Sequence, residues 1–131
     1  MRLENYLRSD RYRELAEEVI EEHEALHWLK YVRIDYISSI KDKKSKDRDV
    51  YGECIKIKEM YQLYVPYDFI IVIYELHTHR MTEEQLKILL YHELLHIGCK
   101  EKDGELIYTT NPHDIEDFRT IISKYGMDWA R

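Results

Sequence analysis

The spacing of apolar residues predicts that an amphipathic helix spans residues 11–32. Apolar side chains recur in this segment every three or four positions, and acidic residues lie mostly on the opposite face. Ser9 or Asp10 precedes the segment, and both are residue types that cap the N-terminus of a helix. The pattern therefore indicates a helix that packs against the rest of the fold along one side.

Three later segments show the patterns of β-strands. Apolar and polar residues alternate over residues 32–40 and again over residues 50–58, as in strands with one buried face. Residues 41–49 between them have the sequence KDKKSKDRD, and this charge run predicts a solvated hairpin loop. Residues 68–75 are more uniformly apolar and predict a third strand. We therefore expect a three-stranded, mainly antiparallel sheet.

A second long helix is predicted to begin after Thr82. Thr82 and Gln85 have the spacing of a capping box, in which Thr82 is the N-cap and Gln85 bonds back to it. Leucine and isoleucine residues then lie nearly all round the helix, so it should run through the core. Gly98 is the predicted stop.

The C-terminal segment is predicted to contain a turn, a short strand and a last helix. Asp103 and Gly104 form a tight-turn signal, and residues 105–109 have the pattern of a short strand. Residues 114–124 predict a helix with apolar residues toward the core, and Gly126 ends it. With the preceding elements, this gives an α+β fold.

His92, Glu93 and His96 form an H-E-x-x-H motif within the predicted core helix. Residues four apart project from nearly the same helix face, so both imidazoles can bind one metal ion. Glu93 lies on the adjoining face, where its carboxylate can accept a proton from a water molecule that the metal activates. These residue types predict a zinc site for hydrolysis. In the alternative interpretation, they are core histidines bonded to backbone, and their burial is costly unless each polar group is satisfied.

A second H-E-x-x-H match, at His23, Glu24 and His27, lies within the first predicted helix. Both histidines fall at the edge of the apolar face, where they can pack with one nitrogen toward solvent. No glycine stop follows, and no later histidine lies at a suitable distance before the first strand. We therefore interpret this copy as coincidence or packing and expect the metal at the later motif.

A catalytic zinc usually has three protein ligands and one open position. His113 is the predicted third ligand, because it follows His96 after a loop long enough to fold back over the metal. Glu116 lies one helical turn further on and is the alternative third ligand. Asp114 or Asp117 is placed to accept the free ring N–H of a bound histidine.

Two stretches of the sequence carry a resemblance to a known family. Residues 91–97, YHELLHI, followed by residues 112–118, PHDIEDF, resemble the phage-type metallopeptidase domain and, more distantly, are similar to SprT-like zinc proteases. The resemblance covers most of the chain. It implies a zincin-like fold in which the three histidines proposed above bind zinc and Glu93 is the general base. SprT-like proteases act on proteins attached to DNA, and that substrate class does not extend to this acidic chain.

Length and composition favour one domain over residues 1–131, which is long enough to enclose a core. The net charge of −6 argues against nucleic acid as a partner. The apolar run at residues 69–74 is too short to span a bilayer, so we expect no membrane contact. Two cysteines form no disulfide framework, and together with the absence of a signal-peptide pattern this predicts a cytoplasmic protein.

We therefore expect a zincin-like domain that binds Zn²⁺ and hydrolyses a peptide or protein substrate, with Glu93 passing the proton on to the leaving amine. The third strand would pair with extended substrate if it forms the sheet edge at the cleft. Tyr108 is one candidate for stabilising the oxyanion. The rival is a non-enzymatic protein whose zinc serves folding or partner binding. In that case Cys99 or a carboxylate would complete a closed site with four side-chain ligands.

Three further residues have ligand-type side chains and a less specific pattern. His77 and His79 fall between the third strand and the core helix, where we expect solvated loop histidines rather than side chains that line the cleft. Cys99 is close to the motif, and we expect it to pack as a small apolar residue.

Overall fold

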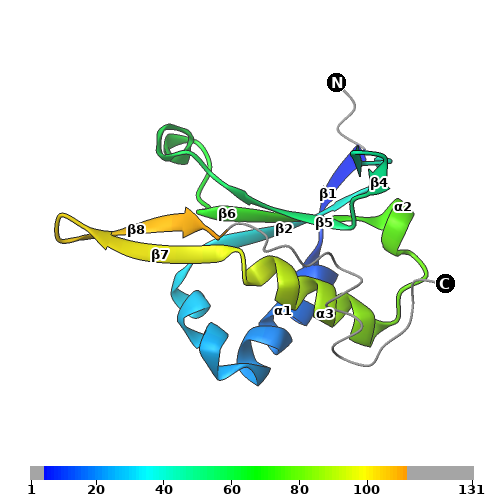
Figure 1. Cartoon of the computed structure of the whole chain (residues 1–131), viewed down its shortest axis with the longest axis horizontal. Coiled ribbons are helices and arrows are strands. Elements are labelled where there is room, and N and C mark those ends of the chain that lie inside the picture. Colours follow the sequence, from blue (N-terminus) through cyan, green and yellow to red (C-terminus); the bar gives the residue numbers. More distant parts are fainter. Residues whose placement is uncertain (1–4, 112–131) are drawn as a thin grey trace.

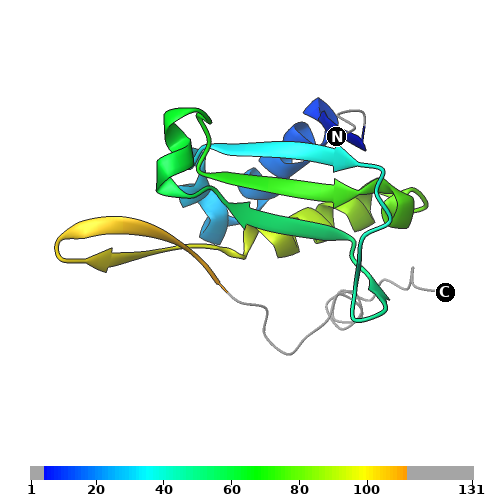
Figure 2. The ribbon, with the colours of Figure 1, turned by 90° about the horizontal axis from the view of Figure 1, so that it is seen from above.

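The computed structural model describes residues 5–111, so the predicted last helix and His113 lie outside the described residues. A four-stranded sheet is covered on one face by two α-helices, α1 and α3 (Figures 1 and 2). A short two-stranded hairpin lies beside one end of the sheet, and a longer hairpin extends away from the other end. This arrangement of helices and sheets is the α+β class that the sequence predicts.

Helix α1 spans Asp10–Glu22 and begins where the sequence predicts. The Ser9 side chain accepts a hydrogen bond from the Tyr12 amide at 3.1 Å, so Ser9 is the N-cap. The helix is shorter than predicted because His23 has an extended backbone, with φ −120° and ψ 106°. The segment Glu24–Tyr31 then forms a separate 3-10 helix, η2.

The main sheet has the strand order β1-β2-β6-β5, which differs from the predicted three-stranded hairpin sheet. Its strands are β1 (Tyr6–Arg8), β2 (Ile34–Ser39), β6 (Phe69–Tyr74) and β5 (Gly52–Lys56). β2 and β6 run parallel, whereas β1 and β5 pair antiparallel with their neighbours. The prediction that β2 and β5 are hairpin partners is therefore wrong, because β6 lies between them.

The composition of β6 explains its central place. Five of its six residues are buried, as expected of a strand that has a neighbour on each side and is covered by helices. β5 is at the edge of the sheet and is at most half-buried. The condition under which the third strand would pair with substrate, that it forms the sheet edge, is not met, because β6 is an inner strand. β1 escaped prediction because its three residues are all exposed and show no alternation.

The predicted hairpin loop at residues 41–49 is exposed, as its charge indicates, and contains a small hairpin of its own. Strands β3 (Lys44–Ser45) and β4 (Arg48–Asp49) pair antiparallel. The two residues between them both have positive φ angles, 52° at Lys46 and 63° at Asp47, which is the backbone of a type I′ turn.

The second hairpin confirms the predicted tight turn. Strands β7 (Ile97–Lys102) and β8 (Glu105–Thr110) are joined by Asp103 and Gly104, whose φ angles are 52° and 83°. β7 begins after a two-residue turn that follows α3, so Gly98 lies in a strand and is not the predicted helix stop.

Helix α3 spans Glu83–Leu94, and the predicted capping box is confirmed by both of its hydrogen bonds. The Gln85 amide donates to Thr82 Oγ1 at 3.2 Å, and the Thr82 amide donates to Gln85 Oε1 at 2.9 Å. A one-turn helix, α2 (Glu75–Thr78), connects the end of β6 to this region.

The core lies between the sheet and the two long helices. Its largest fully buried apolar side chains come from α1, η2, β6 and α3, and they are Val19, Leu29, Phe69, Ile71, Ile73, Leu89, Leu90 and Leu94. Six of these eight side chains belong to β6 or α3, so these two elements supply most of the fully buried core. Within residues 5–111, no helix is long and apolar enough to cross a membrane.

Candidate metal centre

The last turn of α3 brings together the residues of the second H-E-x-x-H motif. His92, Glu93 and His96 are all buried, at 8%, 2% and 9% exposure. His96 lies in the turn just after α3, and the His96 amide donates to the Glu93 carbonyl at 3.1 Å. The rings of the two histidines have centroids 5.0 Å apart and are inclined by 87°. The predicted pair of imidazoles is therefore close enough to share one ion.

A hydrogen bond sets the orientation of the His96 ring. His96 Nδ1 lies 2.6 Å from the backbone carbonyl oxygen of Asn111. A carbonyl oxygen can only accept, so Nδ1 carries the hydrogen and the neutral ring keeps its lone pair on Nε2. This bond is the kind of outer contact that orients a metal-binding histidine, and it leaves the buried Nε2 as the ligand atom.

Asn111 is hydrogen-bonded to the turn that contains Leu95 and His96, a role that the sequence analysis did not predict. Its amide donates to the His96 carbonyl at 2.6 Å, and its side-chain Nδ2 donates to the Leu95 carbonyl at 3.1 Å. Gly98 makes room for it, because a Cβ on Gly98 would lie 2.6 Å from Asn111 Oδ1. The glycine was the available signal, but we interpreted it as a helix stop.

The Glu93 carboxylate lies in an apolar setting. Within residues 5–111, Oε1 is buried without a hydrogen-bond partner. Burial raises the pKa of Glu93 to about 8, and the negative charge of Glu53 adds to the effect. Gly52 of β5 approaches the other oxygen so closely that a Cβ there would lie 3.3 Å from Glu93 Oε2. The carboxyl group therefore sits between α3 and the start of the edge strand.

A pocket of about 140 Å³ opens beside this carboxylate. It lies between α3 and the segment that leads into β5, and its lining residues are Asp49, Val50, Tyr51, Gly52, Leu89, His92 and Glu93. Its volume suits water and a small part of a larger ligand. Glu93 and His92 thus face a space where a reacting group can enter.

The donor set of this centre fits a zinc-type divalent ion. Two buried imidazoles lie together, and His96 presents the lone pair of Nε2. The Glu93 carboxylate lies beside them, and its Oε1 has no hydrogen-bond partner among residues 5–111. The predicted third ligand, His113, and its alternative, Glu116, lie outside the described residues. What the described residues provide is therefore two of three expected ligands and the expected base.

The first H-E-x-x-H copy does not bring its histidines together in the same way. His23 ends α1, and His27 lies in the 3-10 helix η2. The extended backbone at His23 and the three residues per turn of η2 remove the roughly 40° offset that positions four apart have in an α-helix, so the two histidines lose the shared face of that geometry. The His23 ring packs on Tyr91 at 4.5 Å, and His27 Nε2 contacts the Glu21 carbonyl at 3.0 Å. The geometry agrees with the packing interpretation.

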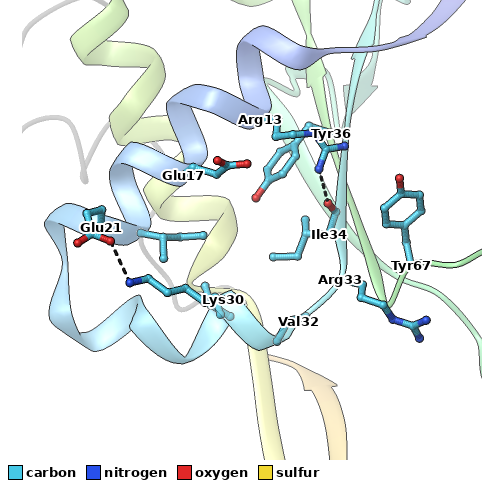
Figure 3. Close-up of a pocket in the computed structure, with 11 residues that line it drawn as sticks. Arg13, Glu17, Glu21, Lys30, Val32, Arg33, Ile34, Tyr36 and Tyr67 are labelled. Atoms are coloured by element: carbon cyan, nitrogen blue, oxygen red, sulfur yellow. Dashed lines mark hydrogen bonds and ion pairs between the residues drawn. The ribbon is translucent and has the colours of Figure 1, made fainter.

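A larger pocket, of about 440 Å³, lies elsewhere, between α1, η2 and β2 (Figure 3). It contains no motif residue, and its cations already have anionic partners. Lys30 pairs with Glu21 at 2.9 Å, and Arg13 pairs with Asp35 at 2.7 Å. The motif residues His92 and Glu93 line the smaller pocket instead.

Two of the secondary predictions about single residues are wrong. The side chain of His77 is only 8% exposed and lies beside two aspartates, so it is not a solvated loop histidine. Cys99 is exposed on β7 and does not pack as an apolar residue. His79 is exposed, as expected, and contacts the Leu76 carbonyl. The Tyr108 ring packs edge-on against Phe69 at 5.9 Å, which favours a packing role.

A family model with the description "Putative phage metallopeptidase" matches residues 4–131, nearly the whole chain. No curated protein matches the chain, and no solved structure matches it.

Proposed function

The chain belongs to the phage metallopeptidase family, and on that premise we propose that it is a zinc-dependent peptidase centred on His92, Glu93 and His96. The observation that carries the proposal is the Glu93 carboxylate, which is buried beside two histidines and whose Oε1 lacks a hydrogen-bond partner within residues 5–111. A buried carboxylate of purely structural role is normally hydrogen-bonded, because its burial is otherwise costly. A general base instead faces the place where its proton donor will enter.

His92 and His96 would hold the ion through imidazole nitrogens, and we propose His113 as the third ligand with Glu116 as the alternative. A bound zinc ion supplies Lewis-acid polarisation of the scissile carbonyl and of the attacking water. Glu93 accepts the proton of that water as the new C–O bond forms. The carboxyl group then donates the proton to the amine nitrogen as the C–N bond breaks.

The electrostatic setting of Glu93 ties its role to a cation. A general base must be ionised, yet with a pKa of about 8 the metal-free carboxyl group is largely protonated at neutral pH. A positive charge nearby favours the ionised form and lowers the pKa. Glu93 therefore becomes a competent base only when a cation is held at the neighbouring histidines, which couples metal binding to activity.

The edge strand β5 offers a binding place for an extended peptide. β5 ends the order β1-β2-β6-β5, and its first residue, Gly52, lies against Glu93 Oε2. A substrate strand added along β5 would form main-chain hydrogen bonds and run past the carboxylate. This takes over the role that sequence analysis gave to the third strand. We propose a peptide or unfolded protein segment as the substrate.

The substitution Glu93→Gln tests the mechanism. Glutamine keeps the size of the side chain but cannot accept the proton. Hydrolysis of casein or of a mixed peptide library by zinc-loaded protein should fall by about 100-fold or more, whereas the zinc content should stay that of the unmodified chain. Glu53→Gln is the matched control, since it removes a neighbouring carboxylate of β5 and should change the rate only a few-fold.

Equal turnover by the Glu93→Gln variant would refute the assignment of the base. If the zinc-loaded, unmodified chain hydrolyses nothing in the library, the non-enzymatic metal-binding role becomes the better account. The zinc content of the variant distinguishes a lost base from a lost metal.

A further inference from the structure

A second group of ligand-type side chains lies where residues 41–49 meet helix α2. His77 Nε2 lies 3.0 Å from Asp42 Oδ1, and His77 Nδ1 lies 3.5 Å from Asp49 Oδ2. One ligand atom from each of the three residues falls within 4.8 Å of the other two. None of them belongs to the H-E-x-x-H motif, so the proposed peptidase mechanism does not use this group.

The histidine in this group has the properties of a ligand. Its side chain is 8% exposed, although both aspartates are about half exposed. Within residues 5–111, His77 Nε2 is buried without a hydrogen-bond partner, even though Asp42 Oδ1 is only 3.0 Å away. The two atoms are thus close but not aligned as donor and acceptor.

Such a contact is the spacing expected of two ligands on one ion. Ligand atoms that each lie about 2.0–2.1 Å from zinc are separated by about 3 Å at a right angle and about 3.4 Å in a tetrahedron. A protonated imidazole held between two carboxylates would instead direct an N–H at each oxygen. The missing alignment at Nε2 therefore favours coordination of an ion through Nε2 over an ion pair. One imidazole gives one ion a single nitrogen, so Asp49, whose nearest contact is Nδ1 at 3.5 Å, would turn its half-exposed carboxylate toward the Nε2 side.

The hairpin that carries the aspartates also needs something to hold it. Residues 40–49 are all exposed, and β3 and β4 are two residues long. An isolated two-stranded hairpin is marginally stable at best. Lys46 and Asp47 occupy the type I′ turn with positive φ angles, a conformation that favours asparagine and glycine. Lys43 pairs with Glu53 of β5 at 3.5 Å, but apolar packing and turn chemistry do not explain why the segment also lies against α2.

From these observations we propose that Asp42, Asp49 and His77 form a second metal site, which fastens the hairpin to α2. An imidazole nitrogen with two carboxylates suits a divalent transition ion, and we assign zinc, because calcium and magnesium prefer oxygen ligands alone. Two ionised aspartates balance the charge of the ion.

This site would also shape the rim of the candidate metal centre. Asp49 lines the pocket that contains His92 and Glu93. The His77 ring packs edge-on against Tyr51 at 6.3 Å, and Tyr51 lines the same pocket. The bound ion would therefore fix the positions of Asp49 and Tyr51, which form one side of that pocket.

Zinc counting tests the proposal. The unmodified chain, His77→Ala and Asp42→Asn are dialysed against micromolar zinc, and bound zinc is measured by mass spectrometry. Both variants should hold one zinc ion fewer than the unmodified chain. His79→Ala and Asp47→Asn are matched controls, since they remove an exposed histidine and an aspartate outside the group, and both should keep the full count. Circular dichroism confirms that each variant folds, and Asp42 is exposed enough for its change to be tolerated.

Trypsin gives a second readout, because residues 41–48 contain five lysine or arginine residues. Zinc should slow cleavage in this segment at least several-fold in the unmodified chain and in His79→Ala, but not in His77→Ala. Equal zinc counts and equal protection in His77→Ala and the unmodified chain would overturn the proposal. If the centre at His92 and His96 binds no zinc, the zinc count of every variant and of the unmodified chain falls by the same amount. The difference between His77→Ala and the unmodified chain then still tests the second site independently of the peptidase proposal.

Discussion

At the scale of single residues, the unusual group is the carboxyl of Glu93. Its pKa of about 8 results from burial first and from the charge of Glu53 second, and the ordinary value for a glutamate side chain is 4.5. Between these values the folded chain keeps a proton that the unfolded chain has lost. By linkage, the contribution of Glu93 to stability falls as the pH rises across this window.

This leads to a prediction for the metal-free protein. Glu93→Gln should be more stable than the unmodified chain at pH 7, by on the order of 1–3 kcal/mol, because glutamine has no proton to lose on unfolding, whereas ionisation of Glu93 favours the unfolded chain. The two proteins should have similar stability near pH 4. Urea unfolding with a chelator at several pH values measures the difference, and the same gap at pH 4 and pH 7 would contradict the linkage.

The H-E-x-x-H motif was predictable from the sequence, whereas the backbone contacts that orient its histidines were not. His92, Glu93 and His96 follow from spacing alone, because a helix converts a four-residue separation into a shared face. The Asn111 carbonyl that orients His96 belongs to backbone that returns through β7 and β8. No local pattern shows which carbonyl a hairpin will bring back to a given ring.

At the scale of elements, the connection between α3 and the β7–β8 hairpin positions His96. Gly98 lies where a Cβ would come within 2.6 Å of Asn111 Oδ1 and 2.8 Å of Thr109 Oγ1. Contacts this short force one of those side chains to move. Because Asn111 bridges the turn to β8, its displacement would disturb the ring of His96.

We therefore predict that Gly98→Ala weakens zinc binding at the centre by about 10-fold or more, the scale for losing an outer-shell contact. Overpacking should also cost about 1–3 kcal/mol of stability. Zinc titration and thermal unfolding measure the two effects. Cys99→Ala is the control, since this exposed neighbour on β7 should tolerate the change. If Cys99→Ala loses more zinc affinity than Gly98→Ala, the rival site completed by Cys99 gains support.

Helix and strand positions were predicted closely where local signals are strong. The capping box fixes the start of α3, and Asp103 with Gly104 fixes the turn between β7 and β8. The first helix was predicted too long, because its periodicity continues through His23 although the backbone becomes extended there. Apolar periodicity does not separate an α-helix from a 3-10 helix that continues along the same buried face.

At the scale of the whole molecule, the order of strands was the main error. Sequence neighbours were expected to pair, but β6 inserts between β2 and β5 because it is the most apolar strand. The position of a strand in the sheet depends on how apolar it is relative to the other strands. That comparison involves the whole chain and is not visible in any local pattern. The similarity to SprT-like proteases and the absence of a nucleic-acid partner stay predictions.

The parallel pair of β2 and β6 is joined at its start by Arg33 and Asp68. The Asp68 carboxylate accepts hydrogen bonds from the Arg33 amide at 3.0 Å, from Arg33 Nη2 at 3.0 Å and from Gln62 Nε2 at 3.2 Å. Burial alone would raise the pKa of Asp68, but the bonds and charge of Arg33 outweigh it and lower the pKa below its ordinary value. The ionised form therefore stabilises the sheet.

Asp68→Asn should accordingly cost about 2 kcal/mol at pH 7, the scale of lost hydrogen bonds to a charged group. A lowered folded pKa gives stability that is present above the unfolded pKa of about 3.9 and is lost as the pH falls through the folded value. The cost should therefore shrink below about pH 4. Asp103→Asn, in the exposed turn, is the control, and a cost that stays constant down to pH 2 would contradict this role.

The most direct test of the central claim is a crystal structure of the zinc-loaded chain with anomalous data collected at the zinc edge. We predict a peak between His92 and His96, with His113 as the third side-chain ligand and a water molecule in the fourth position beside Glu93. No peak at this pair, or a peak at His23 and His27 in its place, would contradict the assignment of the metal centre. A peak enclosed by four side chains would contradict the proposed catalysis.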